Sequence, residues 1–201
     1  MDAALQETLL TFAELEAMLA DEPRWPAVRA AMSTEPPADD MVAAAGRASL
    51  FVRDMAELDD YGATRVTEPA QGLARRLGTA ATVIGLTLAQ PDNRLVPLLL
   101  CADKTCANRV LARVAGPGVV ALSEPGDDDG LPVQVSQLVE GLLAQSDGSV
   151  WVKPQGRPAL TLTRTGQRWQ WCAQSDDGEF HATTLDQARG LLQSFIAAST
   201  Q

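Results

Sequence analysis

The feature that most constrains the fold is a series of short segments that occurs twice in the C-terminal half, about 49 residues apart. Apolar and β-branched runs between turn residues predict strands, and a three- to four-residue apolar spacing predicts helices. The first series has strands over 94–101, 109–114, 118–123 and 131–135 and a helix over 137–145. The second has strands over 149–153, 159–163, 168–173 and 179–182 and a helix over 185–197. Within the helices, Gly141-Leu142-Leu143 recurs as Gly190-Leu191-Leu192.

This recurrence indicates a duplicated sheet-plus-helix unit, over 93–146 and 147–201. Each unit has one apolar sheet face and one apolar helix stripe, and neither is buried by the unit alone. The two units are therefore expected to pack as a pseudo-twofold α+β core. Convergent patterning of two unrelated β-meanders remains open as the alternative.

The N-terminal section, residues 1–92, is predicted to be helical. Apolar residues from Leu5 to Leu19 at three- and four-residue steps indicate a first helix, and Asp39 or Asp40 is suited to cap a second helix that ends before Gly62. A third helix is expected over 67–89, with a break at Gly78 as the alternative. The expected fold class is α+β: this helical section, then two quasi-symmetric antiparallel sheet-plus-helix units, in one compact domain overall.

Charge narrows the function further. Sixteen basic and 26 acidic residues give a net charge of −10, and residues 1–70 hold 14 acidic and 5 basic side chains (−9). Polyanion binding is thus disfavoured, and so is a regulatory helix-turn-helix over 40–90. The longest weakly polar run, 79–89, is too short to cross a bilayer. No Lys or Arg precedes Arg24, so the basic start of a secretory signal peptide is not found. We expect a cytoplasmic protein without nucleic-acid partners or membrane insertion.

An enzyme hypothesis depends on few residues. A four-residue turn over 175–178 places Cys172 opposite His181, as in a thiol nucleophile pair, whereas a two-residue turn separates them. Cys101 and Cys106 lack the further ligands of a zinc site. A disulfide between them across a hairpin is sterically possible, but reduced thiols are the default in the cytosol. The acidic turn over 127–130 lacks the spacing of a calcium loop, and no phosphate loop occurs. No catalytic residue, metal or cofactor is therefore assigned.

Aromatic residues supply the candidate binding site. Trp169 and Trp171 lie two apart on a predicted strand, so both indoles share one sheet face, which Trp151 and Phe180 are candidates to join. With Phe195 of the last helix, the three tryptophans form either a core cluster or a patch that binds a partner, because tryptophan is enriched at binding hot spots. We take Trp151, Trp169, Trp171 and Phe195 as the candidate partner-binding residues.

In layout, the chain resembles the EspG-type chaperones of actinobacterial type VII secretion. The resemblance is carried by Phe12-Ala13-Glu14-Leu15, Ala48-Ser49-Leu50, Leu88-Ala89-Gln90-Pro91-Asp92 and the segment from Trp169 to Phe195. It implies an N-terminal helical section and two sheet-plus-helix halves. It also implies a cytosolic, non-enzymatic chaperone that binds the hydrophobic tip of helical PE/PPE-like substrates. A small thiol enzyme using Cys172 and His181, or a regulatory protein-interaction module, are the alternatives.

Overall fold

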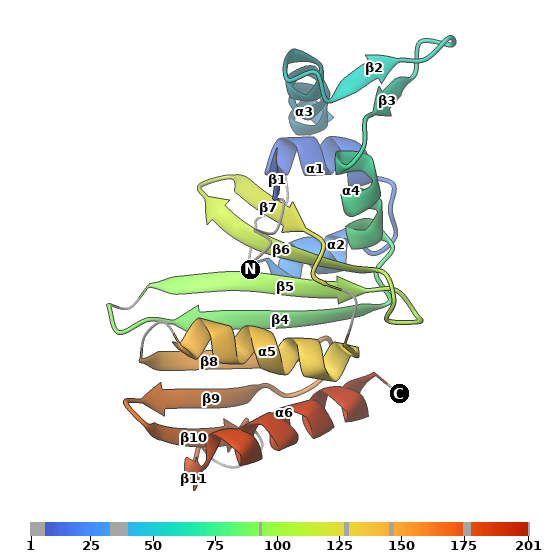
Figure 1. Cartoon of the computed structure of the whole chain (residues 1–201). Coiled ribbons are helices and arrows are strands. Elements are labelled where there is room, and N and C mark those ends of the chain that lie inside the picture. The colour runs from blue at the N-terminus through green and yellow to red at the C-terminus, as the bar shows by residue number, and fades with distance from the viewer. Residues whose placement is uncertain are drawn as a thin grey trace. The chain divides into compact units, whose positions relative to one another are not determined.

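The computed structural model describes residues 7–32, 40–92, 94–126, 129–144, 147–174 and 178–200. Within these ranges the chain forms six helices and eleven strands, which confirms the α+β class (Figure 1). Nine strands belong to an antiparallel sheet, and β2 (Ala56–Leu58) and β3 (Thr64–Val66) form a separate hairpin. No helix in the described ranges is long and apolar enough to cross a membrane.

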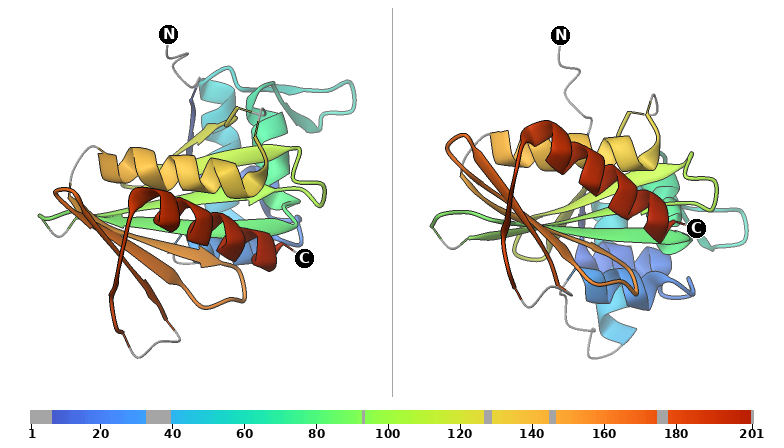
Figure 2. Two further views of the ribbon diagram at one scale, coloured as in Figure 1. Left: turned by 60° about the horizontal axis from the view of Figure 1, so that its bottom comes forward. Right: turned by 90° about the horizontal axis from the view of Figure 1, so that it is seen from below.

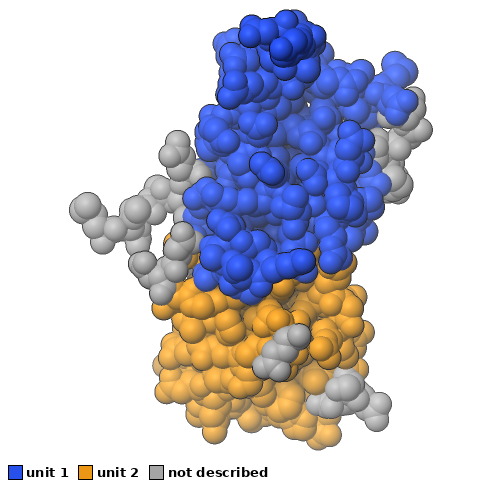
Figure 3. Space-filling view, turned by 90° about the vertical axis from the view of Figure 1, so that its right-hand side faces the viewer, with its two compact units in different colours: residues 1–81, 101–125 blue, residues 82–100, 126–201 orange. Residues whose placement is uncertain are grey.

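The chain divides into two compact units (Figure 3). Unit 1 contains residues 1–81 and 101–125, and unit 2 contains residues 82–100 and 126–201. The chain passes from one unit to the other after Ala81, Leu100 and Pro125. The units therefore differ from the expected sections 1–92 and 93–201.

Unit 1 combines four helices with three whole strands of the large sheet and the β2–β3 hairpin. Its helices are α1 (Phe12–Leu19), α2 (Trp25–Ala31), α3 (Asp40–Val52) and α4 (Ala70–Gly78). Its strands are β1 (Thr8–Thr11), β7 (Val119–Ser123) and β6 (Arg109–Gly116), hydrogen-bonded in that order. The core is apolar and includes Leu15, Trp25, Leu50 and Leu77, each at most 1% exposed.

Helices α1 and α3 pack closely because α3 has a glycine at the contact. A Cβ atom on Gly46 would lie 1.9 Å from the backbone oxygen of Ala13, so only glycine fits there. One residue further along α1, the fully buried Glu14 accepts hydrogen bonds from Ser49 Oγ and Arg53 Nη1 of the α3 segment. A buried carboxylate therefore joins the two helices.

Unit 2 consists of a sheet with two helices packed on one face (Figure 2). The strands run in the order β5 (Leu95–Ala102), β4 (Thr82–Ala89), β8 (Gly148–Pro154), β9 (Leu160–Thr165), β10 (Arg168–Ala173) and β11 (His181–Thr183). The helices are α5 (Leu131–Ala144) and α6 (Leu185–Ser199). Val150, Leu160 and Leu162 of the sheet are buried, as are Val139 and Leu192 of the helices.

The expected helix over 67–89 is wrong, because α4 ends at Gly78 and the next segment is strand β4. Ile84 and Leu88 fit both the four-residue step of a helix and the two-residue step of a strand. Leu86 lies between them and is also fully buried, which only the strand explains. β-branched Thr82 and Val83 favour the extended backbone as well.

The expected strand over 131–135 is also wrong, because this segment is the first part of α5. The buried residues of this helix recur at four-residue steps: Leu131, Val135, Val139 and Leu143. The two-residue alternation of apolar residues over 131–135, which predicted a strand, is part of this longer helical pattern. Pro132 is tolerated because it lies in the first helical turn, where backbone N–H groups have no helical partner.

Two smaller expectations at the N-terminal side need correction. The first helix begins at Phe12 rather than near Leu5, since Thr8–Thr11 is β1 and Thr11 caps α1; Leu5 itself lies outside the described residues, as does Asp39. Gly62 does not end the second helix, because it lies in the β2–β3 turn with a left-handed φ of 78°.

The remaining predicted strands and the last helix match the observed elements to within about two residues. Along the chain, four strands precede each of α5 and α6, namely β4 to β7 and β8 to β11. The order of four strands followed by a helix thus occurs twice. In the first series, the fourth strand is β4 at the start rather than the expected strand over 131–135 at the end. Equivalence of Leu142 and Leu143 with Leu191 and Leu192 stays a prediction.

Candidate functional site

Strand β10 presents two tryptophans on the helix-covered face of the unit 2 sheet. Trp169 pairs with Arg164 and Trp171 pairs with Leu162 on β9, and Leu162 is buried. Trp169 and Leu162 lie together against α5 and α6, where Val139 and Leu192 also line a small void. The prediction that both indoles share one face is confirmed. Both are half-buried, so each retains surface for contact with another molecule.

Trp169 also lines an open cavity of about 340 Å³ in unit 2. Leu185 at the start of α6 faces it, and Ala144 at the end of α5 closes another side. The remaining lining residues come from α5, from the end of β9 and from the β9–β10 turn: Glu140, Arg164, Gly166 and Gln167. We call this cavity the Trp169 groove.

Ionic and hydrogen-bonded contacts fix the rim of the Trp169 groove. Arg189 Nε and Nη2 donate to the two carboxylate oxygens of Glu140 at 2.6 and 2.9 Å, which links α6 to α5. These hydrogen bonds raise the pKa of Arg189, so the guanidinium stays charged. Arg164 Nε donates to the carbonyl of Gly166 at 2.9 Å, and its Nη1 donates to the carbonyl of Leu143 at 2.5 Å.

A capping box positions Leu185. The hydroxyl of Thr184 accepts a hydrogen bond from the backbone N–H of Gln187, and the Gln187 side chain accepts one from the backbone N–H of Thr184. This arrangement fixes the first turn of α6, and therefore the position of the 38% exposed Leu185 at the groove. The Thr-x-x-Gln spacing was a signal for this residue that the sequence interpretation did not use.

Trp171 lies beside the groove rather than in it. Its ring centroid is 4.8 Å from that of His181, the residue directly opposite on β11, and the rings are tilted by 36°. Phe195, on α6, is half-buried and does not line the groove. Phe180, just before β11, is 48% exposed.

Trp151 lies on the opposite face of the sheet. It pairs with Thr161 of β9, and Thr161 pairs with Cys172 of β10. Because side chains alternate along a strand, Trp151 shares a face with Cys172 and not with Trp169 or Trp171. The expectation that Trp151 joins the other two tryptophans is wrong, since it depended on a register that the sequence does not specify.

The same register separates the proposed thiol–imidazole pair. His181 lies opposite Trp171, so Cys172, one residue further, points to the other face. The Cys172 thiol is buried and contacts the carbonyl oxygen of Ala173 at 3.4 Å. The four-residue-turn geometry that would place Cys172 opposite His181 is therefore wrong; residues 175–177 of that turn lie outside the described residues.

The other cysteine and acidic motifs belong to loops and the core. Cys101 and Cys106 are free, and burial raises the pKa of the Cys101 thiol to about 12. Asp103 accepts hydrogen bonds from Asn108 and Thr105, which lower the pKa of its carboxyl to about 2. In the acidic turn, Asp127 and Asp128 lie outside the described residues, and no metal-binding cluster occurs among the residues that are described.

No protein-family model matches the chain, and no curated protein matches its sequence.

Proposed function

We propose that this chain is a cytosolic, non-enzymatic chaperone of the type VII secretion kind, which binds the apolar tip of a helical PE/PPE-like protein. The observation that carries the proposal is the Trp169 groove of unit 2. The side chains of Trp169 and Leu185 line this open cavity, and both are only partly buried within unit 2. Each therefore keeps apolar surface that a partner can cover.

The dimensions of the groove favour a helix tip over a whole helix. A cavity of about 340 Å³ accommodates a few large apolar side chains, such as those at the end of a helical hairpin. Helix-binding grooves obtain most of their affinity from a few such anchors, and tryptophan is among the strongest contributors. The Arg189–Glu140 contact sets the rim before the partner arrives, which lowers the ordering cost of binding.

The candidate residues differ in their expected contribution. Trp169 is the central anchor, together with Leu185. Trp171 extends the same sheet face, and Phe195 extends the surface along α6. Trp151 lies on the other face, so a partner held in the Trp169 groove does not contact it.

This difference between the tryptophans gives the experiment a matched control. Co-expressed PE/PPE-like pairs are tested for binding to the full chain by pull-down, and binding pairs are then measured by calorimetry. Trp169→Ala and Leu185→Gln should each weaken binding, with the tryptophan change costing at least about 2 kcal/mol, or roughly thirtyfold in affinity. Trp151→Ala removes an exposed indole from the other face and should leave affinity within about twofold.

Thermal melts of the same variants separate binding from folding. Leu185→Gln changes a partly exposed residue and should leave the melting temperature almost unchanged. If Trp169→Ala and Leu185→Gln are both folded and bind the partner as tightly as the unmodified chain does, the proposed groove is contradicted. Absence of binding to every PE/PPE-like pair contradicts the proposed class of partner.

A further inference from the structure

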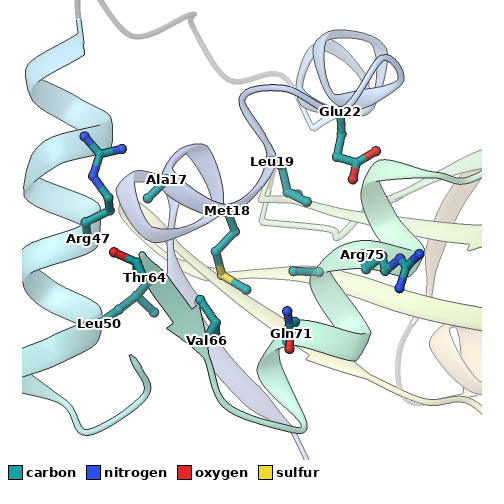
Figure 4. Close-up of a pocket in the computed structure, with 11 residues that line it drawn as sticks. Ala17, Met18, Leu19, Glu22, Arg47, Leu50, Thr64, Val66, Gln71 and Arg75 are labelled. Atoms are coloured by element: carbon teal, nitrogen blue, oxygen red, sulfur yellow. The ribbon is translucent and has the colours of Figure 1, made fainter. Parts of the chain in front are cut away.

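A second cavity, of about 400 Å³, lies in unit 1 between α1, α3, α4 and β3 (Figure 4). Apolar side chains from all four elements line it: Ala17, Met18, Leu19, Leu50, Val66 and Ala74. Thr64 and Gln71 add neutral polar groups. All of the cavity's lining residues belong to unit 1, and none of them lines the Trp169 groove.

Two arginines flank the cavity from opposite sides. Arg47 comes from α3 and Arg75 comes from α4, and the apolar side chains of Met18 and Val66 lie between these helices (Figure 4). Both arginines are exposed, and no ion pair joins either of them to a residue in the described ranges. Two cationic groups are thus available at the ends of an apolar surface.

Several other arginines of unit 1 are held by carboxylates. Arg29, Arg53, Arg76 and Arg113 each have a carboxylate partner, at N–O distances from 2.6 to 3.1 Å. The chain has 26 acidic residues and a net charge of −10, so carboxylates are abundant. Within the described part of the chain, no ion pair is formed by Arg47 or Arg75, nor by Arg24 or Arg65. Of these four, Arg47 and Arg75 line the cavity, so two free guanidinium groups flank one apolar surface.

We propose that this cavity docks a segment of a partner protein in which an apolar anchor is flanked on both sides by carboxylates. The anchor packs on Met18, Leu50 and Val66, and one carboxylate pairs with each of Arg47 and Arg75. Charge complementarity of this kind gives specificity and speeds association, while the apolar contact supplies affinity. The site is separate from the Trp169 groove, and its test does not depend on the proposed chaperone function.

Glu22 adds a prediction of opposite sign. Glu22 also lines the cavity, and its carboxylate has no ion pair with a described residue. It therefore opposes an acidic segment, and neutralising it should strengthen binding.

The probes are blocked peptides with a central pair of leucines and glutamates on both flanks, with matched peptides carrying lysine or glutamine there instead. They are titrated into the isotope-labelled full chain, and amide chemical shifts are followed. The glutamate peptide should shift the amides of the lining residues and bind at least tenfold more tightly than the lysine peptide. The preference should shrink as salt is added, because these charges are exposed.

Variants locate the effect. Arg47→Gln and Arg75→Gln should each weaken binding of the glutamate peptide about fivefold or more, and Glu22→Gln should strengthen it. Arg65→Gln is the control, because this exposed arginine of β3 carries the same charge but does not line the cavity. Equal affinity for the lysine peptide, an equal loss in Arg65→Gln, or no shift at the lining amides overturns the proposal.

Discussion

The carboxylate of Glu14 is fully buried and lies 2.6 Å from the guanidinium nitrogen Nη1 of Arg53. Ser49 Oγ donates a second hydrogen bond at 2.6 Å, and the backbone N–H of Thr11 donates a third at 2.7 Å. Residues far apart in sequence thus meet at one side chain, which both caps α1 and attaches it to α3. Glu14 is therefore expected to be essential to the packing of unit 1.

Replacing Glu14 by Gln should lower the free energy of unfolding by about 2 kcal/mol. The amide retains the shape of the side chain but loses the charge-assisted hydrogen bonds and leaves Arg53 without its carboxylate partner. Chemical denaturation at neutral pH measures this loss. The solvent-exposed Glu57 of β2 is the control, because Glu57→Gln removes the same charge at the surface and should change stability by less than about 0.5 kcal/mol.

The same carboxylate predicts a pH dependence. Burial raises the pKa of Glu14, but hydrogen bonds from Ser49 and Thr11 and the charge of Arg53 outweigh it, so the pKa is lowered overall. For a lowered pKa, the stabilisation is fully present above the unfolded value, about 4.3, and is lost as pH falls through the folded value. The stability difference between wild type and Glu14→Gln should therefore be constant from neutral pH to about pH 5 and shrink below about pH 4. A difference that grows on acidification contradicts the assignment.

Gly46→Ala should destabilise unit 1 by at least about 2 kcal/mol. The added methyl group would overlap the backbone oxygen of Ala13 at 1.9 Å, and backbone atoms do not move aside as a flexible side chain does. Gly141→Ala in α5 is the matched control, since no atom lies within 4 Å of its added Cβ. Helix propensity alone should make that second variant more stable, by up to about 1 kcal/mol. Similar melting temperatures for the two variants contradict the close contact.

The three cysteines should react with an alkylating reagent at different rates. Cys106 is partly exposed in a loop, whereas Cys101 and Cys172 are buried. Burial also raises the pKa of Cys101 to about 12, so almost no thiolate is present at pH 8. Mass spectrometry of the folded protein should find Cys106 modified first and Cys101 last, and denaturant should remove the difference. Rapid modification of Cys101 in the folded chain would show that β5 is not packed as described.

Local patterns in the sequence predict many of the strands and helices of unit 2, but not the register in which neighbouring strands pair. Alternation along 168–173 places Trp169 and Trp171 on one face, and the structure agrees. The pairing of Trp171 with His181 depends on the turn between them, for which the sequence allows more than one length, so the face of Cys172 relative to His181 was ambiguous. The position of Trp151 depends in the same way on the register of β8 with β9.

Cavities depend on contacts between distant segments, which explains why both were missed. Leu185 and Trp169 belong to different elements, and only the packing of α6 on the sheet brings them to one groove. The cavity in unit 1 requires strand β3, which is held in place by its pairing with β2. The sequence interpretation had the second helix continue to Gly62, which left no hairpin in this segment.

The cap of α6 gives a prediction that connects stability with the groove. Thr184→Ala removes the side-chain acceptor for the backbone N–H of Gln187 and should lower the free energy of unfolding by about 1 kcal/mol, because this donor then lacks a partner in the helix. Thr184→Ser keeps an acceptor oxygen at the same position and should recover most of the loss. Since the cap fixes the first turn, hydrogen exchange at the start of α6 should accelerate in the alanine variant and remain slow further along the helix.

Binding provides the second measurement on these variants. Loosening of the first turn frees Leu185, one of the apolar residues at the Trp169 groove, so Thr184→Ala should weaken binding of a partner even though Thr184 itself does not line the groove. The serine variant should restore affinity and stability together. Weaker stability with unchanged affinity would show that Leu185 does not need its capped position, and the groove would then depend on Trp169 and the β9–β10 turn alone.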